Sequence, residues 1–501
     1  MSFALKALAW VAPGMAMSRA RALATLDNID GTRSYDGARG GRRGSSFTAG
    51  ATSANVEIGS ALARLRDRSR DLVRNTSTGA RIIDIHVGHT IGIGINAVPD
   101  NGSDKIDRQV KELREEWEAS SDVEGVQCFG GQQAMAFRSM LEGGDCIIRR
   151  IPMRESSGLR VPLKLQVLEG DFIDAARDQG IFEQQMSRLG VGLGAFDRRT
   201  GYWLHAQHPG DFTFHGAPYA SQFVDFADAI HLHRPLRAGQ VRGVPVLAPV
   251  LMNARDLGDV MDAIVVKQRV EASFAGFVSR KDVGADPLNA KPGDKRVDTM
   301  RPGTLTYLQD GESITFGQPS SAGQFEQVWV TTMMGMAAGA GLTYDQVTGD
   351  LRQANYSSLN AGDIHRRRLC EQTQEHVLVP QMMRRTSGWF IDAAIMSGAL
   401  KPRRQGYRWN YILPAVEPVD PRKALEADIL AVRSGRLTPQ EFIGAWGQDW
   451  RKVIADTTAF FRMLDEQPGN LVLDIDPRRV SQAGIAQTEP SKPATKVEEA
   501  D

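Results

Sequence analysis

Apolar side chains recur at the spacing of an α-helix in several parts of the chain. In DKIDRQVKELREEWEASS, the residues Ile106, Val110, Leu113 and Trp117 form one stripe, which predicts a helix. GSALARLRDRSRDLVRN has leucines at near-helical spacing with arginines around them, so an amphipathic helix is expected there. Its basic face is either solvated or in contact with an acidic surface or phosphate. A third helix is expected over residues 132–143.

Between these helices the pattern favours strands. RIIDIHVGHTIGIGINAV, at residues 79–98, is β-branched and partly alternating, so it is expected to form strand with glycine breaks. Strands are also predicted near residues 145–151 and 161–168, and AFDRRTGYWLHA is expected to be a hairpin with Thr200 and Gly201 in its turn. The irregular order of helices and strands predicts an α+β fold and not a doubly wound sheet.

Two long helical patterns flank a charged segment in the middle of the chain. From Val244 to Phe277 the pattern is helical, with a bend at most near Pro249, and it resumes in QFEQVWVTTMMGMAAGAGL. Between them lie a loop rich in proline, glycine and charge and a short β unit, TLTYLQDGESITF. At ~1.5 Å per residue the first helix would approach ~50 Å. The pattern therefore predicts a stalk with a small unit at its tip.

The last third of the chain is expected to be helical after one long loop. TYDQVTGDLRQANYSSLNAG is polar without periodicity, and a long helix is predicted from about Ile364 to Pro380 or beyond. Asp-Pro at 420–421 and the capping box Thr-Pro-Gln-Glu at 438–441 mark the starts of two further helices. From Gln467 onward, proline, serine, alanine and charge predict a disordered tail.

Composition and charge narrow the classes of function. The 501 residues are 42% apolar and 24% charged, which is typical of a folded protein with more than one core. A formal net charge of zero argues against a tight, sequence-independent nucleic-acid binder, so any contact with DNA must use local patches. Three cysteines without a Cys-x-x-Cys pair predict a reducing compartment. No stretch approaches the ~18 apolar residues of a membrane span.

No arrangement of residues predicts catalysis or metal binding. The glycines of residues 190–194 resemble a phosphate loop only in composition, because a hairpin follows them, so a flexible turn is expected. His231 and His233 share one face of a strand as two metal ligands do, but no third ligand accompanies them, which favours ordinary strand histidines. The remaining histidines considered as ligands are equally weak candidates: His205, His208 and His215. We therefore expect a protein that is not an enzyme, with no catalytic residue, cofactor or metal.

Three polar or basic surfaces remain as candidates for binding. The charged loop 279–301, either solvated or a docking site for a partner, has basic residues between aspartates: Arg280, Lys281, Lys291, Lys295, Arg296 and Arg301. The polar loop 348–360 contains small polar residues around one arginine and one tyrosine: Asp350, Arg352, Gln353, Asn355, Tyr356, Ser357 and Ser358. The predicted long helix carries a basic run that is either solvated or a weak phosphate-binding face: Arg366, Arg367 and Arg368.

The order of several segments is specific to one family. RSYDGA, LQVLEGDFID, AIHLHRPLRAGQVRGVPVLAPVLMNARDLGDVMDAIVVKQRVEASF, PGTLTYLQDGESITF and LTYDQVTGDLRQANYSSLNAGDIHRRRL follow one another along roughly residues 33–450. In this order they resemble the lambda-type portal proteins of tailed bacteriophages.

The resemblance implies an α+β portal fold with an α/β wing, a two-helix stem, a small clip, a tunnel loop and an α-helical crown, assembled as a dodecameric ring. It divides the chain into a flexible N-terminal arm (1–55), the first part of the wing (56–243), a stem helix (244–277), the clip (278–322), a second stem helix (323–346), the tunnel loop (347–360), a long helix with the second part of the wing (361–418), the crown (419–466) and a disordered tail (467–501).

The resemblance also implies a function and partners. Such a ring sits at one capsid vertex, the head-tail junction of the virion, after assembly in the host cytoplasm; it nucleates procapsid assembly and is a channel for DNA packaging and ejection. Its partners are further copies of itself, non-specifically passing double-stranded viral DNA, the terminase large subunit, the major capsid and scaffold proteins, and head-completion or tail adaptor proteins, with no membrane. The loop residues 350–358 and the arginines 366–368 would face DNA, and the basic clip residues would contact terminase or adaptors. The alternatives are an enzyme such as a nuclease or protease, and a monomeric DNA-binding protein.

Overall fold

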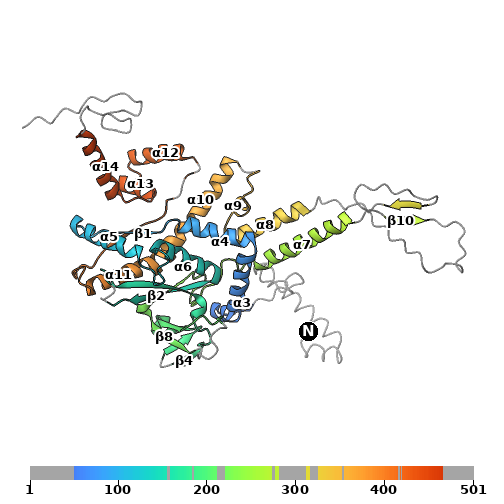
Figure 1. The fold of residues 1–501 in the computed structure, drawn as a ribbon, viewed down its shortest axis with the longest axis horizontal. Helices are drawn as coiled ribbons and strands as arrows, with labels where there is room; N and C mark the ends of the chain where they lie inside the picture. The colour runs from blue at the N-terminus through green and yellow to red at the C-terminus, as the bar shows by residue number, and fades with distance from the viewer. Residues whose placement is uncertain are drawn as a thin grey trace, which may run out of the picture. The chain divides into compact units, whose positions relative to one another are not determined.

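The computed structural model describes residues 50–154, 158–182, 185–211, 220–273, 277–280, 312–315, 325–352, 355–415, 418 and 420–466 (Figure 1). The expected N-terminal arm up to residue 49, the tail from residue 467 and most of the expected clip lie outside these ranges. Internal contacts divide the chain into Met1–Glu57 and Ile58–Asp501. Apart from the first turn of one helix, everything described below belongs to the second unit.

Helix α3 (Ala54–Asn75) confirms the amphipathic helix expected there. Its apolar residues Leu62 and Leu72 are buried, as the spacing predicts. Its basic face is not solvated throughout, because Arg66 is buried and both Arg66 and Arg70 form ion pairs with Asp171. Contact with an acidic surface, the alternative interpretation, is therefore the one that the structure supports for these two arginines.

Helix α4 (Ser77–Thr90) occupies most of the segment that we expected to be strand, so that prediction is wrong except for β1 (Asn96–Pro99). Ile82 and Ile83 are completely buried in the core, and the helix contacts α6, α9 and α10. Isoleucine is a weaker helix former than alanine by less than ~0.7 kcal/mol. Burying such a side chain contributes roughly 1.5–3 kcal/mol. Packing therefore outweighs the β-branched preference.

Helices α5 (Asp104–Ala119) and α6 (Phe129–Gly143) confirm two further predictions. The stripe of α5 is buried at Val110, Leu113 and Trp117. Helix α6 packs on a three-stranded antiparallel sheet of order β3-β2-β9, with bounds β2 Asp145–Pro152, β3 Leu163–Glu169 and β9 Ala229–His233 (Figure 1). The strands expected near 145–151 and 161–168 are thus confirmed. This sheet and the helices on it hold the main hydrophobic core.

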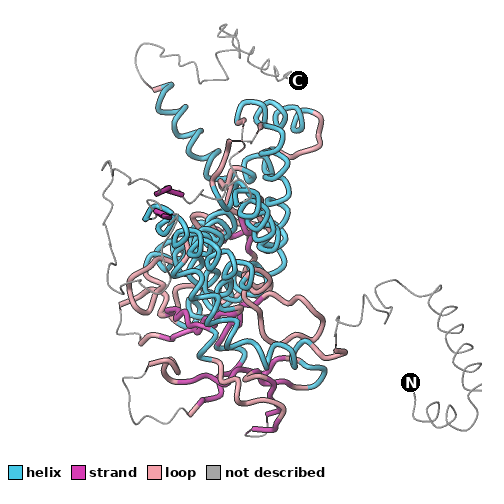
Figure 2. The backbone as a smooth tube through the Cα atoms, turned by 90° about the vertical axis from the view of Figure 1, so that its right-hand side faces the viewer, coloured by secondary structure: helices cyan, strands magenta, loops and turns pink. Residues whose placement is uncertain are grey.

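A second, five-stranded antiparallel sheet has the order β4-β5-β6-β7-β8, and its strands are magenta in Figure 2. The bounds are β4 Gly180–Phe182, β5 Gln185–Arg188, β6 Val191–Leu193, β7 Arg199–His205 and β8 Ser221–Asp225. The prediction of a flexible turn over the glycines of residues 190–194 is wrong, because β6 is a buried strand there. The hairpin is confirmed, but Thr200 and Gly201 lie inside β7, and the turn is η4 (Ala195–Asp197). Gly201 fits that strand position because a side chain there would collide with the ring of Phe223.

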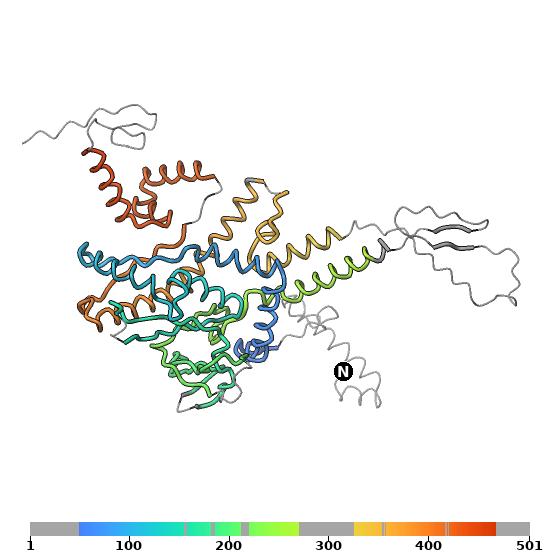
Figure 3. The backbone as a smooth tube through the Cα atoms, viewed as in Figure 1, coloured from blue at the N-terminus to red at the C-terminus, as the bar shows by residue number. Residues whose placement is uncertain are grey.

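Two helices with strands between them follow in the middle of the chain, as expected. Helix α7 (Leu251–Ser273) contacts α8 (Phe325–Ala340), and the two lie side by side in Figure 3. Between them in sequence, β10 (Phe277–Arg280) pairs antiparallel with β11 (Glu312–Thr315). Helix α7 begins seven residues later than the pattern predicted, after Pro249, because a proline is poorly tolerated inside a helix.

A continuous helical stretch follows one short helix and a loop. Helix α9 (Tyr344–Thr348) precedes α10 (Tyr356–Thr373), so the loop is shorter than the polar segment expected to lack structure. From α10 the chain continues through the π-helical segment η7 (Gln374–Met383) into α11 (Arg384–Met396), which confirms the long helix expected to reach Pro380 or beyond, although it begins at Tyr356, earlier than the expected Ile364.

The C-terminal helices begin where their capping signals predict. Helix α12 (Pro421–Arg433) is capped by Asp420, and α13 (Pro439–Ala445) has the full capping box of Thr438 and Glu441. Helix α14 (Trp450–Asp465) follows, and β12 (Trp409–Ile412) pairs with β1 before them. None of the helices described in these ranges is long and apolar enough to span a bilayer.

Candidate functional site

The loop between α9 and α10 begins and ends in fixed backbone conformations. Gly349 ends α9 at a positive φ of 72°, and Asn355 caps α10. The Asn355 Oδ1 atom accepts from the Ser358 backbone N–H at 2.8 Å, and the Ser358 Oγ atom accepts from the Asn355 N–H at 3.0 Å. These two residues therefore stabilise the helix start while staying exposed, as does Ser357. Gln353 and the side chain of Tyr356 lie outside the described part.

Arg352 and Asp350 form a two-pronged ion pair inside this loop. The Arg352 Nε atom lies 2.9 Å from Asp350 Oδ1 and its Nη2 atom 2.8 Å from Oδ2. Tyr344 donates its hydroxyl to the same carboxylate at 3.3 Å. The hydrogen bond from Arg352 holds the pKa of Asp350 well below its ordinary value. The guanidinium is 74% exposed but already neutralised, so a phosphate must compete with Asp350 for it.

The basic run on α10 is less available than its sequence suggests. Arg366 is only 6% exposed and forms an ion pair with Asp363, which is also 2.8 Å from the Arg367 Nε atom. Burial alone would raise the pKa of Asp363, but the hydrogen bonds and charges of Arg366 and Arg367 lower it. Arg368 is exposed. The exposed part of this basic surface thus consists of Arg368 and part of Arg367.

The structure describes the backbone of one of the six basic residues expected in the clip. Arg280 is the last residue of β10 and is paired in register with Glu312 of β11. The other five lie outside the described ranges: Lys281, Lys291, Lys295, Arg296 and Arg301. Their role stays a prediction.

A buried charge cluster that the sequence did not predict centres on Asp145 at the start of β2. Its carboxylate accepts from Arg66 at 3.0 Å, from the Arg242 Nε atom at 2.5 Å and from His231 at 3.2 Å, and it is fully buried. Burial would raise the pKa of Asp145, but Arg242, His231 and Arg66 together hold it well below its ordinary value. Two of these partners lie in AIHLHRPLRAGQVRGVP, so the family-specific segment was the available signal.

The two strand histidines belong to the same cluster and do not form a metal site. Arg199 of β7 donates to His231 Nδ1 at 2.7 Å and to His233 Nε2 at 2.9 Å. An arginine can only donate, so both nitrogens accept and both rings are neutral. The rings stack with centroids 4.6 Å apart. Arg199 therefore links the five-stranded sheet to β9 and occupies the nitrogens that a metal would need.

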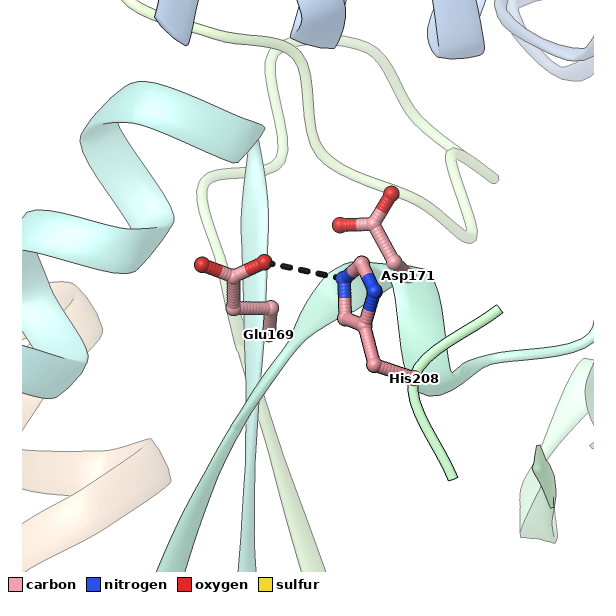
Figure 4. A group of neighbouring side chains, drawn as sticks. All are labelled: Glu169, Asp171 and His208. Carbon is pink, nitrogen blue, oxygen red and sulfur yellow. Dashed lines mark hydrogen bonds and ion pairs between the residues drawn. The ribbon is translucent and has the colours of Figure 1, made fainter. Parts of the chain in front are cut away.

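A group that could geometrically hold a cation lies at the edge of this cluster. Glu169, Asp171 and His208 bring their ligand atoms within 4.8 Å of one another, and His208 Nε2 is 3.2 Å from Glu169 (Figure 4). However, Arg70 lies 2.8 Å from Glu169 and 2.5 Å from Asp171, and Arg66 lies 3.0 Å from Asp171. Two guanidinium groups already neutralise these carboxylates, so the arrangement favours an ion-pair network over a cation site.

Comparison with known families assigns the chain. The model of the family described as phage portal protein, lambda family, matches residues 40–374. The chain belongs to this family. The matched range contains the Asp145 cluster, the loop between α9 and α10, and the arginines of α10, and it ends at the start of η7.

The individual proteins that this chain resembles are distant from it in sequence. A protein of Halomonas phage phiHAP-1 described as a probable portal protein is 22% identical over 461 residues, covering 85% of each chain. A chain in the neck of a native GTA particle is 15% identical with a TM-score of 0.42, over 76% of this chain and 93% of that one. An HK97 family phage portal protein from Corynebacterium diphtheriae is 9% identical with a TM-score of 0.32, over 71% and 95%.

In this portal protein, we expect protonation of His233 to lower the free energy of unfolding in mild acid. Burial, with Arg199 nearby, lowers the pKa of His233 to about 4. As the pH falls, the unfolded chain, in which histidine has an ordinary pKa near ~6.5, binds the proton first. The contribution of neutral His233 to the free energy of unfolding is therefore fully present above that pH and is lost as the pH drops toward 4. We expect a loss of about 3 kcal/mol from this residue across the window. Urea unfolding at several pH values checks it.

The control is His233→Gln, which keeps an acceptor for Arg199 but cannot titrate. Its free energy of unfolding should depend less on pH between 4 and 6.5 than that of the unmodified protein. Identical pH profiles for the two proteins would contradict the assignment.

Proposed function

We propose that this portal protein assembles as a dodecameric ring at one capsid vertex and forms the channel through which viral DNA enters and leaves. The observation that carries the proposal is the family match over residues 40–374. The ring is proposed to be a virion structural component at the head-tail junction, assembled in the host cytoplasm, and to have no enzymatic activity. It nucleates procapsid assembly together with the major capsid and scaffold proteins.

Exposed apolar side chains on α7 support self-association. Met252, Val260, Met261, Val265 and Val266 are all exposed in the single chain. A helix that leaves this much apolar surface in water gains about 25 cal/mol for every Å² that a neighbour covers. We propose that α7 and α8 are the two stem helices, that residues 278–322 form the clip where the terminase large subunit and later the adaptor proteins dock, and that α12 to α14 form the crown.

The polar loop between α9 and α10 suits contact with moving DNA. Among its described residues, Leu351 exposes an apolar side chain at 59%, and the other exposed groups are small and polar or, at Arg352, neutralised by Asp350. In a ring every retained phosphate contact is repeated around the channel, and the added affinity would slow translocation. A neutral ion pair meets phosphate weakly, which agrees with the zero net charge of the whole chain. We propose that Asp350, Arg352, Asn355, Ser357 and Ser358 face the DNA.

Negative-stain microscopy of the purified protein tests the proposed assembly. Rings with a central channel are expected, whereas a monodisperse monomer under assembly conditions contradicts the proposal. Nuclease and protease assays address the enzyme alternative, for which we expect no activity above a buffer control. A monomeric DNA-binding protein would instead bind DNA tightly with a strong dependence on salt.

Replacing the two members of the loop ion pair should have opposite effects on DNA. Arg352→Ala should leave rings and procapsids intact but change the packaged length or the retention of DNA. Asp350→Asn should free the guanidinium, raise the DNA affinity of the ring and steepen the slope of log K against log salt by about 0.9 for each additional phosphate that the ring neutralises. Filter binding over a salt series and the length of packaged DNA measure both.

The double variant and an exposed pair elsewhere are the controls. Asp350→Asn combined with Arg352→Ala should behave like Arg352→Ala alone, because the freed group is gone. Arg422→Ala removes another exposed arginine, at 89%, which is paired to Glu426 at 3.0 Å on α12, and it should not alter packaging or retention. Unchanged packaging and retention in Arg352→Ala would remove that residue from the channel.

A further inference from the structure

The turn between β6 and β7 presents an aromatic side chain to solvent in a disfavoured backbone conformation. Phe196 is fully exposed, at 104% of its reference area, and has φ 58° and ψ 33°. Asp197 next to it has φ 56°. Two consecutive positive φ values define a turn in which glycine or asparagine is favoured, and a bulky residue there is an outlier. An outlier of this kind in an exposed turn indicates a binding role for the side chain.

A groove along the outer edge of β8 offers a place for such a side chain. It has a volume of about 960 Å³ and lies between β8, the end of β2, the start of β3 and α11. Apolar groups line much of it, among them Ile151, Val224, Trp389 and Met396, and Met396 is 84% exposed. Within the described ranges β8 pairs only with β7, so this edge has no strand partner. An open edge beside apolar side chains is a surface that proteins normally cover.

Charges of both signs lie beside the aromatic ring and along the groove. The turn carries an acid and a base, Asp197 and Arg198, directly after Phe196. The groove is lined by Arg149 and Arg150 of β2 and by three acids, Asp225, Asp228 and Asp392, of which Asp228 pairs with Arg150 at 2.5 Å. Phe196 is fully solvated, so it does not fill the groove of its own chain. Each copy therefore presents one exposed aromatic side chain and one apolar groove at different places on its surface.

We propose that Phe196 of one copy inserts into the β8 groove of the next copy. An anchor and a groove at different places on one chain make a heterologous contact, and such contacts close into a ring when the rotation between copies allows it. The occupant is thus a second copy of this chain, and the inference rests on the ring assembly proposed above. The backbone strain at Phe196 is retained because the assembled ring of subunits needs a large aromatic side chain at that position.

Glycine substitutions in the turn separate strain from binding. Phe196→Gly relieves the strain of the positive φ, so the isolated subunit should melt at a higher temperature. The protein concentration at which half of the subunits are in rings should rise by roughly tenfold or more. Asp197→Gly relieves the same strain but keeps the ring of Phe196, so it should melt higher and assemble at the concentration of the unmodified protein. Thermal melts and sedimentation velocity over a concentration series measure these effects.

Cross-linking places the contact directly. In a Cys128→Ser background, which removes the exposed native cysteine, Ala195→Cys and Met396→Cys keep Phe196 and put one thiol beside it and one in the groove. A short bismaleimide added to assembled rings should give a ladder of covalent multimers on a denaturing gel. The matched control joins Met396→Cys to Val126→Cys, another exposed position at 77%, and should give no ladder.

The outcomes distinguish this contact from ring assembly itself. If rings form, but Phe196→Gly assembles like Asp197→Gly or the ladder is no longer than in the Val126 control, the contact is overturned. If the unmodified protein forms no rings at all, the proposed function fails and this inference fails with it.

Discussion

Asp145→Asn is expected to lower the free energy of unfolding by about 3–5 kcal/mol, enough to leave most of the chain insoluble on expression. The amide keeps the shape of the carboxylate but removes its charge. The buried Arg242 then loses its counter-charge, the buried Arg66 loses one of its carboxylate partners and retains Asp171, and the hydrogen bond that His231 donates to the carboxylate is weakened. Breaking one side of a buried ion pair is costly because the remaining charge stays desolvated. Urea unfolding followed by tryptophan fluorescence measures the loss.

An exposed ion pair of similar geometry is the matched control. Glu116 lies 3.1 Å from Arg160, with both side chains more than half exposed. Glu116→Gln should cost less than about 1 kcal/mol, because water replaces the lost partner. Equal unfolding midpoints for the Asp145 and Glu116 variants would show that the Asp145 cluster does not stabilise the fold.

Gly243→Ala should destabilise the protein by about 3 kcal/mol, at the upper end of the cost of overpacking a core. A Cβ atom at position 243 would lie 1.8 Å from the carbonyl oxygen of Gly144, a backbone atom that no rotamer change can move away. Gly144 itself has a φ of 92°, so the facing backbone cannot relax toward ordinary values without breaking its turn. The displacement would also shift Arg242, the neighbouring residue, away from Asp145. Soluble yield and the urea midpoint report the effect.

A glycine in open surroundings provides the opposite expectation. Gly335 lies in the middle of α8, and a Cβ there would meet nothing within 4 Å. Gly335→Ala should stabilise the subunit by roughly 0.5–1 kcal/mol, because alanine has the higher helix propensity. A Gly243→Ala protein as stable as the Gly335→Ala protein would contradict the close backbone contact.

Local signals predicted much of the helical structure. The stripe of α5, the proline and aspartate that start α12 and the capping box of α13 act within a few residues, so the sequence was sufficient to place these elements. The same local logic failed at α4, where a β-branched pattern suggested strand. It failed again at Thr200 and Gly201, where a turn was expected and the turn actually formed at Phe196 and Asp197. In both places contacts with distant elements outweighed a weak local preference.

The candidate site divides in the same way. The loop residues and the arginines of α10 were found from composition and from the resemblance, but their pairing was not. Asp350 neutralises Arg352, and Asp363 neutralises the buried Arg366. Charge counted along the sequence therefore overestimated the basic surface available to DNA, because it ignored which acids lie two to four residues away on the same helix or loop.

The family, the two helices with strands between them in the middle of the chain, and the starts of α12 and α13 could be predicted from the sequence, because these depend on motif order, periodicity and capping. Two features could be seen only in the folded chain: Asp145 pairs with Arg66 and Arg242, which lie 79 and 97 residues away, and Phe196 is exposed on a strained turn. Pairings over such distances follow from how sheets and helices pack. No spacing along the chain specifies them, and they determine which charges are buried and which side chains stay exposed.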